Sequence, residues 1–272
     1  MTERREIQTQ KSRLPAMLVL LVAMAAMMAS GDPRSVAVNS PVETEPVLIS
    51  AQSTAEVTPL HSIDVVAEEP EEPEESLVEE SAPVEDTYFE DAVFLGDSRT
   101  EGFALYSGLE EGTYFCAVGA TVESVFSKAV ETEVGRLPLL DAMAETACGK
   151  IYVMLGVNEL GWAKTETFRT QYAKLIDRLR TDHPEAEVII QSILPVSAKQ
   201  EEKGSYVNNT RIAEYNEILQ ELANEKGCPF LNVAEAVSEE DGTLRADWNF
   251  DGVHLNPKGC RVWLEYLKTH SV

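Results

Sequence analysis

From Tyr88 to the C-terminus, short apolar runs alternate along the chain with longer segments of mixed character. Runs rich in β-branched and aromatic residues predict strands. The unbroken apolar run at 151–155 is typical of a strand covered on both faces. The expected strands are 92–95, 113–118, 150–155, 187–193 and 229–233.

Between these runs, apolar residues recur at helical spacing. The expected helices are 99–106, 136–147, 165–182, 208–226 and 257–269. Gly227 is typical of a helix end, and Pro257 is typical of a first turn. Strands that alternate with helices predict a five-stranded parallel sheet in a three-layer α/β/α sandwich. By analogy with small doubly wound folds, we expect the strand order 2-1-3-4-5.

The chain before this domain has two distinct parts. In residues 1–30, a basic stretch precedes an apolar run from Leu14 to Ala29, which indicates an export signal or membrane anchor. The run is shorter than the roughly 20 residues of a full span, and a buried core helix is the alternative. Residues 31–87 hold seven prolines and fifteen acidic residues against one basic residue. This composition predicts a disordered, extended linker, and residues 88–272 then form the folded domain.

Charge and cysteine content restrict the possible partners. The net charge of −25 argues against nucleic acid or an anionic surface as a partner, so we expect membrane contact through the N-terminal segment only.

The cysteine spacings match no zinc site, and the linker glutamates match no calcium loop. Small buried thiols are the favoured interpretation, although a disulfide stays open for an exported chain. The four cysteines are Cys116, Cys148, Cys228 and Cys260.

Ser98 follows the first predicted strand, in Gly96-Asp97-Ser98, and opens the next helix. There the free backbone N–H groups and the helix dipole can stabilise negative charge, so Ser98 is a candidate nucleophile. An ordinary helix cap is the alternative.

Gly119 and Asn158 follow the second and third strands. Because the carboxyl ends of parallel strands meet at one edge, the N–H groups of Ser98 and Gly119 and the Asn158 amide form a candidate oxyanion hole. Ordinary turn residues are the alternative at both positions.

A base for Ser98 must come from one of four histidines. His61 lies in the linker, His183 is expected to be an exposed helix cap, and His270 is two residues from the C-terminus. His254 follows Asp251 by three residues with a glycine between them, so the carboxylate can orient the imidazole toward Ser98.

These blocks, Gly96-Asp97-Ser98, Gly119, Gly156-Val157-Asn158 and Asp251-Gly252-Val253-His254, resemble in order and spacing those of the SGNH, or GDSL, hydrolase family. The resemblance covers about residues 90–270 and implies a flavodoxin-like fold. It also implies Ser98 as nucleophile, His254 as base, Asp251 as its orienter, and Gly119 and Asn158 in the oxyanion hole. Glu159 departs from the aspartate of many members. Arg99 and Glu101 are variable positions that we expect to shape the pocket.

The implied reaction is ester hydrolysis through an acyl-enzyme, without metal or organic cofactor. We expect an esterase for small acyl groups, acetyl foremost, on a small-molecule or carbohydrate ester of the cell envelope or the exterior. It would be held at the membrane with its domain outside the cytoplasm, or secreted if the leader is cleaved. An O-acyltransferase and a non-catalytic surface-binding module are the alternatives. Natural substrate, acyl-chain length and oligomeric state stay open.

Overall fold

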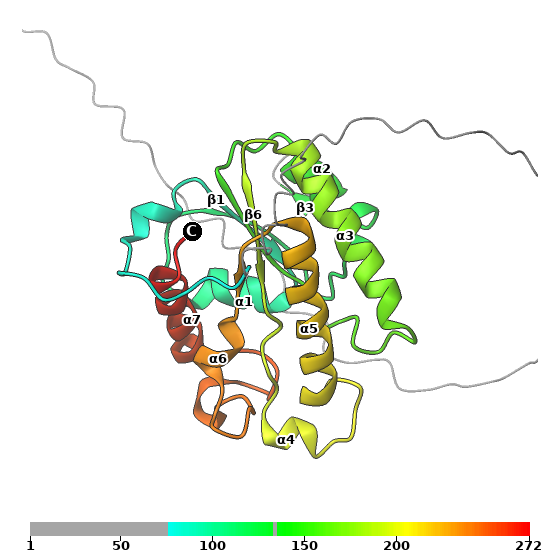
Figure 1. The fold of residues 1–272 in the computed structure, drawn as a ribbon, viewed down its shortest axis with the longest axis vertical. Coiled ribbons are helices and arrows are strands. Elements are labelled where there is room, and N and C mark those ends of the chain that lie inside the picture. Colours follow the sequence, from blue (N-terminus) through cyan, green and yellow to red (C-terminus); the bar gives the residue numbers. More distant parts are fainter. Residues whose placement is uncertain (1–75, 133–134) are drawn as a thin grey trace, which may run out of the picture. The chain divides into compact units, whose positions relative to one another are not determined.

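The computed structural model describes residues 76–132 and 135–272 (Figure 1). At its centre lies a parallel sheet in the order β2-β1-β5-β6-β7. Counted among these strands alone, this is the predicted order 2-1-3-4-5, and the predicted α/β fold is confirmed. The strands are β1 (Ala92–Gly96), β2 (Thr113–Cys116), β5 (Lys150–Met154), β6 (Glu187–Gln191) and β7 (Phe230–Leu231).

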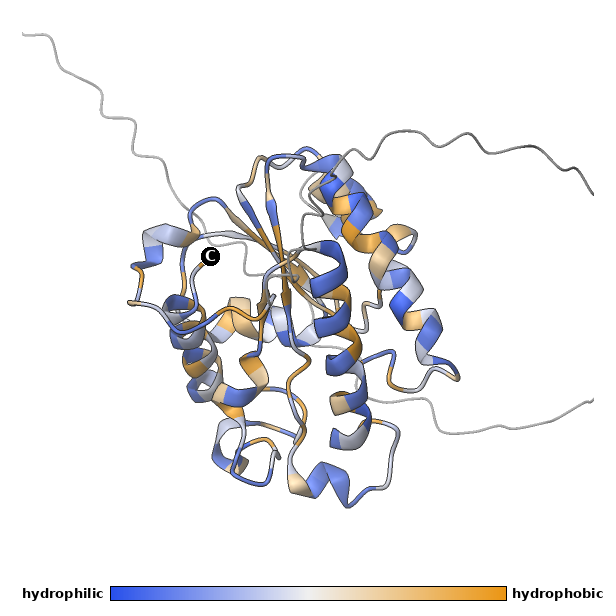
Figure 2. Cartoon of the chain, viewed as in Figure 1, coloured by the Kyte–Doolittle hydropathy of each residue, from blue (hydrophilic) through white to orange (hydrophobic). Residues whose placement is uncertain are grey.

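Helices cover both faces of the sheet, because alternate strand residues point to opposite sides. In β1, Val93 and Leu95 pack beneath α3 (Thr165–Asp182) and α5 (Asn209–Lys226). Their neighbours Ala92 and Phe94 pack on the other face, beneath three other helices. Figure 2 shows the apolar strands enclosed by helices with hydrophilic outer sides. The helices of the second face are α1 (Ser98–Tyr106), α6 (Val233–Val237) and α7 (Pro257–Thr269).

Smaller elements complete the described part of the chain. A two-stranded antiparallel ribbon joins β3 (Ala129–Thr132) to β4 (Gly135–Pro138). The short α-helices are α2 (Leu139–Met143) and α4 (Ala198–Glu201). The 3-10 helices are η1 (Asp86–Phe89), η2 (Ser124–Phe126) and η3 (Ala246–Trp248).

α2 is shorter than the helix predicted at 136–147, because it begins at Leu139 and ends at Met143. Pro138 is the reason for the late start, because a proline disfavours helical backbone at the residue before it. The chain therefore stays extended through β4, and α2 begins only after Pro138.

Three strand ends also differ from the prediction by two residues. The second strand ends at Cys116 rather than at 118, and the fourth ends at Gln191 rather than at 193. The last ends at Leu231 rather than at 233, because α6 begins at Val233. The segment 194–207, expected to be a polar loop, contains α4, whose first turn is capped by the Ser197 hydroxyl.

The chain joins the domain earlier than the predicted linker boundary at residue 87. Leu77 bridges in parallel to Phe230 at the free edge of β7, and the N–H groups of Ser81 and Val84 donate to carbonyls at the end of α7. These backbone bonds order residues 76–87 against the edge of the sheet and the end of α7.

The predicted signal or anchor and the linker up to residue 75 lie outside the described residues. Within 76–132 and 135–272, no helix is long and apolar enough to cross a membrane.

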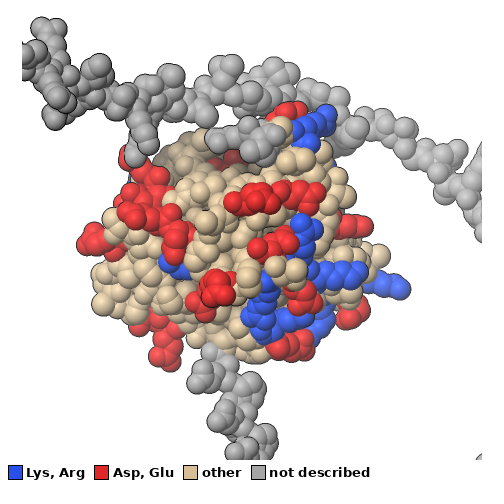
Figure 3. Space-filling view, turned by 90° about the horizontal axis from the view of Figure 1, so that it is seen from above, with Lys and Arg blue, Asp and Glu red and all other residues tan. Residues whose placement is uncertain are grey.

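Charged side chains lie on the outside of the domain. Figure 3 shows acidic groups spread over one face and basic groups gathered in one region of it. Between α3 and α5, Arg169 pairs with Glu221 and Glu225, and Lys226 pairs with Asp177. Such exposed pairs stabilise little, so the apolar core beneath them fixes the helices. All four cysteines are unpaired. Cys228 and Cys260 are buried as the favoured interpretation expected, whereas Cys116 and Cys148 are only partly buried.

Candidate active site

Ser98 stands where β1 turns into α1. Asp97 caps the helix by accepting the Arg99 N–H at 2.8 Å, which leaves Ser98 as the first helical residue. Within the described chain no acceptor binds the Ser98 N–H, so this donor is available to a ligand. The predicted strand, tight turn and helix start thus lie around this serine as the sequence indicated.

The Ser98 hydroxyl lies 3.0 Å from His254 Nε2, and His254 Nδ1 lies 2.8 Å from Asp251 Oδ2. This contact fixes Nδ1 as the protonated ring nitrogen, which leaves the Nε2 lone pair facing the hydroxyl. The other Asp251 oxygen accepts the backbone N–H groups of Val253 and His254 at 2.9 Å each. Partial burial raises the pKa of Asp251, but these hydrogen bonds outweigh it and hold the pKa below its usual value.

Gly252 makes the close approach of Asp251 to His254 possible. Its φ is +95°, a conformation that side chains disfavour, and a Cβ there would lie 2.6 Å from the Ser197 hydroxyl. A larger residue would therefore displace the turn that joins the two side chains.

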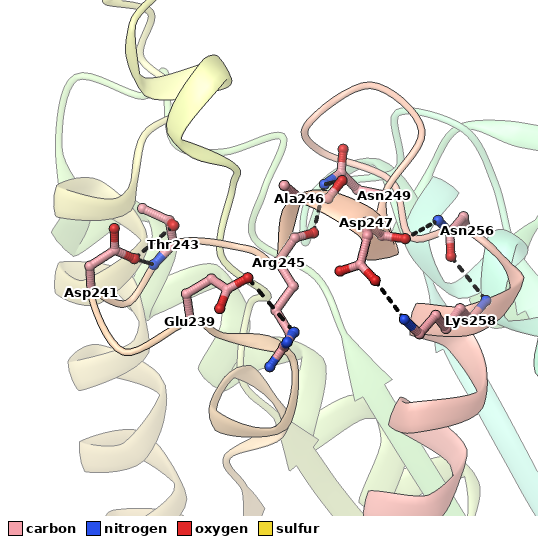
Figure 4. A network of polar contacts seen from close by, with 9 residues as sticks. All are labelled: Glu239, Asp241, Thr243, Arg245, Ala246, Asp247, Asn249, Asn256 and Lys258. Atoms are coloured by element: carbon pink, nitrogen blue, oxygen red, sulfur yellow. Dashed lines mark hydrogen bonds and ion pairs between the residues drawn. The ribbon is translucent and has the colours of Figure 1, made fainter.

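Both residues belong to the histidine loop, as we name residues 238–256 between α6 and α7. Polar contacts hold this loop at its surface (Figure 4). The Asn249 amide donates to the Arg245 carbonyl at 2.9 Å, and the Asn256 amide donates to the Asp247 carbonyl at 2.9 Å. Lys258 pairs with Asp247 at 2.5 Å. The loop therefore has a defined backbone, although the side chains of His254 and Asp251 are 40% and 46% exposed.

Asn158 connects the segments around Ser98 and Gly119. Its amide donates to the Ala120 carbonyl at 2.8 Å and makes a long contact of 3.4 Å with Asp97 Oδ2. Gly119 lies beside Ala120 with φ +72°, and its N–H has no acceptor among the described residues. The three predicted donors thus belong to segments joined through one amide. To bind an oxyanion, Asn158 would give up its weaker contact, the one with Asp97.

The model of the GDSL-like lipase/acylhydrolase family matches residues 94–262, which span the whole site. The chain belongs to this family. The resemblance seen in the four sequence blocks is therefore confirmed, and the protein is a serine ester hydrolase.

Relatives of this acylhydrolase are distant. The isoamyl acetate-hydrolyzing esterase of Saccharomyces cerevisiae is 21% identical over 201 residues, which cover 66% of this chain and 84% of the yeast protein. A Streptococcus pneumonia protein provisionally described as a platelet activating factor is similar in structure, with a TM-score of 0.56 and 24% identity over 65% of this chain and 82% of its own. The acetyl xylan esterase AlAXEase gives a TM-score of 0.50 and 16% identity over 66% of this chain and 99% of its own. At these identities the solved structures support the fold alone.

Glu159 has a structural role in this acylhydrolase that its sequence position did not reveal. It is fully buried, and its Oε1 accepts the Val122 N–H at 2.7 Å. Two consecutive residues after β5, Asn158 and Glu159, therefore hold the segment that carries Gly119. Oε2 has no hydrogen-bond partner in the described part of the chain. Burial raises the pKa of Glu159 to about 8, so the carboxyl is mostly protonated at neutral pH.

Arg99 was expected to shape the pocket of the acylhydrolase and is instead buried, at 3% exposure. Its Nη1 donates to the Leu194 carbonyl at 2.7 Å. Burial lowers the pKa of Arg99 to about 10, against the opposing effect of Asp97 and Asp251. The guanidinium therefore acts inside the protein, where it connects the start of α1 to the segment after β6.

Neither His183 nor His270 takes part in the site. His183 follows α3 as expected but is buried rather than exposed. The His270 ring lies against Tyr266 at the end of α7, and His61 lies outside the described residues. In residues 76–132 and 135–272, no group of three His, Cys, Asp or Glu side chains is placed to hold a metal ion.

Proposed function

We propose that this acylhydrolase cleaves esters of short acyl groups with Ser98 as nucleophile, His254 as general base and Asp251 as its orienter. One observation carries the proposal, namely the unbroken chain of contacts from the Ser98 hydroxyl through both nitrogens of His254 to the Asp251 carboxylate. Such a chain activates a serine that is otherwise a weak nucleophile.

In the proposed reaction, His254 takes the hydroxyl proton while the Ser98 oxygen attacks the ester carbonyl. The oxyanion then accepts hydrogen bonds from the N–H groups of Ser98 and Gly119 and from the Asn158 amide. His254 returns the proton to the departing alcohol, which leaves an acyl-serine. Water, activated by the same imidazole, attacks the acyl-serine and restores the free hydroxyl.

Acetyl is the acyl group we favour. The name of the yeast relative assigns it an acetate ester, and AlAXEase is by name an acetyl xylan esterase. The alcohol we propose is a carbohydrate of the cell envelope or the exterior, because the basic and apolar N-terminus has the layout of an export signal or anchor. Protease treatment of intact cells tests the location, since only an exterior domain is degraded.

Turnover of p-nitrophenyl acetate, butyrate and octanoate by the full chain tests the chemistry. We expect the rate to fall with chain length, and we expect a fluorophosphonate to label Ser98. The Ser98→Ala variant should lose at least about 10⁴-fold in kcat with an unchanged melting temperature. Retained activity in that variant would reject the assignment.

Two further results would change the proposed reaction class. An absence of both turnover and labelling in the wild type would favour a non-catalytic binding module. A sugar acceptor added to the assay separates hydrolysis from acyl transfer, because a transferase would acetylate the sugar instead of releasing acetate.

A further inference from the structure

A pocket of about 480 Å³ opens beside the catalytic carboxylate. One wall is the start of α4, at residues 197–199, and the other walls come from two parts of the histidine loop, between Glu239 and Ala246 and between Asn249 and Gly252. The volume falls within the range of small-molecule sites. Because Asp251 is part of the wall, a ligand here would lie next to the carboxylate that contacts His254 Nδ1.

Phe250 presents an apolar ring at this pocket. Its side chain is 61% exposed, although its N–H donates to the His254 carbonyl at 2.9 Å and so fixes its backbone. The edge of the ring meets Tyr106, itself 39% exposed, with 5.7 Å between centroids. Because Phe250 lines the pocket, its exposed ring offers an apolar surface to a ligand there.

The charges of the walls restrict the ligand. Glu239 and Asp251 bring two negative charges and Lys199 brings one positive charge, and the Arg245 guanidinium lies 3.7 Å from the Glu239 carboxylate. The charges around the pocket therefore nearly balance, which favours a neutral ligand over a strongly charged one. Among the described residues, no acidic group pairs with the Lys199 ammonium, which leaves its donors free. Ser197, Thr243 and Asn249 add polar surface.

We propose that this pocket binds a neutral pyranose ring of the alcohol part of the ester, with one ring face against Phe250 and its hydroxyls toward Lys199 and Glu239. A pyranose matches these walls because it combines apolar C–H faces with a rim of hydroxyl groups. The proposal deepens the proposed function and rests on it, since it names the sugar subsite of the same ester hydrolysis.

The test compares Phe250→Ala with Leu105→Ala in the full chain. Leu105 is the matched control, because it is 65% exposed and does not line the pocket. The substrates are p-nitrophenyl acetate and O-acetylated oligosaccharides of xylose, mannose and N-acetylglucosamine. For at least one sugar ester, Phe250→Ala should raise KM at least about tenfold more than it raises KM for p-nitrophenyl acetate. The Leu105→Ala variant should leave this ratio within about twofold of the wild type.

A binding measurement separates this proposal from the proposed function. Saturation-transfer NMR with the unacetylated oligosaccharides should show contact with the wild type and with Ser98→Ala, and its loss in Phe250→Ala. Two results would overturn the sugar subsite. The first is an equal rise in KM for both substrate types in Phe250→Ala. The second is turnover of p-nitrophenyl acetate by a wild type that neither turns over nor binds any of the sugars. Sugar binding without any ester turnover would overturn the proposed function and leave only a sugar-binding site at Phe250.

Discussion

The side chains that hold the segments of Ser98 and Asn158 are buried, whereas the side-chain contacts that hold the loop of His254 and Asp251 are exposed. On the first side, which we call the strand-end side, Glu159 and Asp97 have at most 1% exposure. On the second side, the His254 and Asp251 side chains are 40% and 46% exposed, and surface contacts such as Lys258–Asp247 hold the loop. The two halves of the proposed triad thus have two kinds of support.

The difference has a physical consequence. A hydrogen bond in a buried setting is strong, and leaving one of its partners unpaired is costly, so the strand-end side tolerates little change. An exposed pair is weakened by water and salt, so the histidine loop depends on its backbone turns instead. Gly252 and the two N–H groups bound to Asp251 supply this backbone order.

Replacing the exposed carboxylate tests whether solvent makes the loop side less important. The Asp251→Asn variant should lose about 10³-fold or more in kcat/KM for p-nitrophenyl acetate, because asparagine no longer fixes the ring proton on His254 Nδ1. Its melting temperature should change little. A loss below tenfold would show that water can take over the role of Asp251.

Removing an amide on the strand-end side gives the matching measurement. The Asn158→Ala variant should lose roughly 10²-fold in kcat, because one oxyanion donor is gone. It should also lower the melting temperature, since the Ala120 carbonyl loses its 2.8 Å partner. A purely structural role would instead lower stability while kcat of the folded fraction stayed at the wild-type value.

Glu159 provides a pH test of the buried side. Its pKa is raised by burial from 4.5 to about 8, so the unfolded chain gives up this proton at lower pH than the folded protein. Stability should therefore fall as pH rises from about 5 to 8. In Glu159→Gln, which keeps an acceptor for Val122, this loss should be absent. Over that pH range, the melting temperature of the variant minus that of the wild type should rise by more than about 2 °C. A difference that does not change with pH would contradict the raised pKa of Glu159.

The smallest effect is expected for the exposed ion pair of the histidine loop. The Asp247→Asn variant should keep kcat/KM within about twofold of the wild type at both low and high salt. Asn256→Ala is the matched comparison, because Asn256 caps α7 and binds the Asp247 carbonyl. It should destabilise the protein by about 1 kcal/mol. If Asp247→Asn lowered the free energy of unfolding as much as Asn256→Ala does, the surface charges would matter as much as the backbone contacts.

The two sides also differ in how far the sequence could predict them. Apolar runs located β1 and β5, and the parallel topology then brought Ser98 and Asn158 to one edge. The spacing of Asp251, Gly252 and His254 indicated a turn that joins the carboxylate to the imidazole. Local patterns were sufficient there, because each signal lies within a few residues of the side chain it positions.

Interactions over long sequence separation could not be predicted in this way. The bond from Val122 to Glu159 spans 37 positions, and the bond from Arg99 to the Leu194 carbonyl spans 95. Burial of charged side chains depends on such partners. From the sequence, Glu159 was therefore only a departure from the family's aspartate, and Arg99 was expected to shape the pocket. Nor did the acidic, proline-containing composition before Tyr88 reveal that Leu77 pairs with Phe230, because the partner is the free edge of a strand far along the chain.

That pairing has a practical outcome. Ser81 and Val84 reach the last residues of α7, whereas His254 precedes its first turn, so the described chain comes into the domain at the opposite end of α7 from His254. A bead, a chip or a bilayer attached directly before residue 76 would therefore lie away from His254 and leave the candidate site open to large polymeric esters.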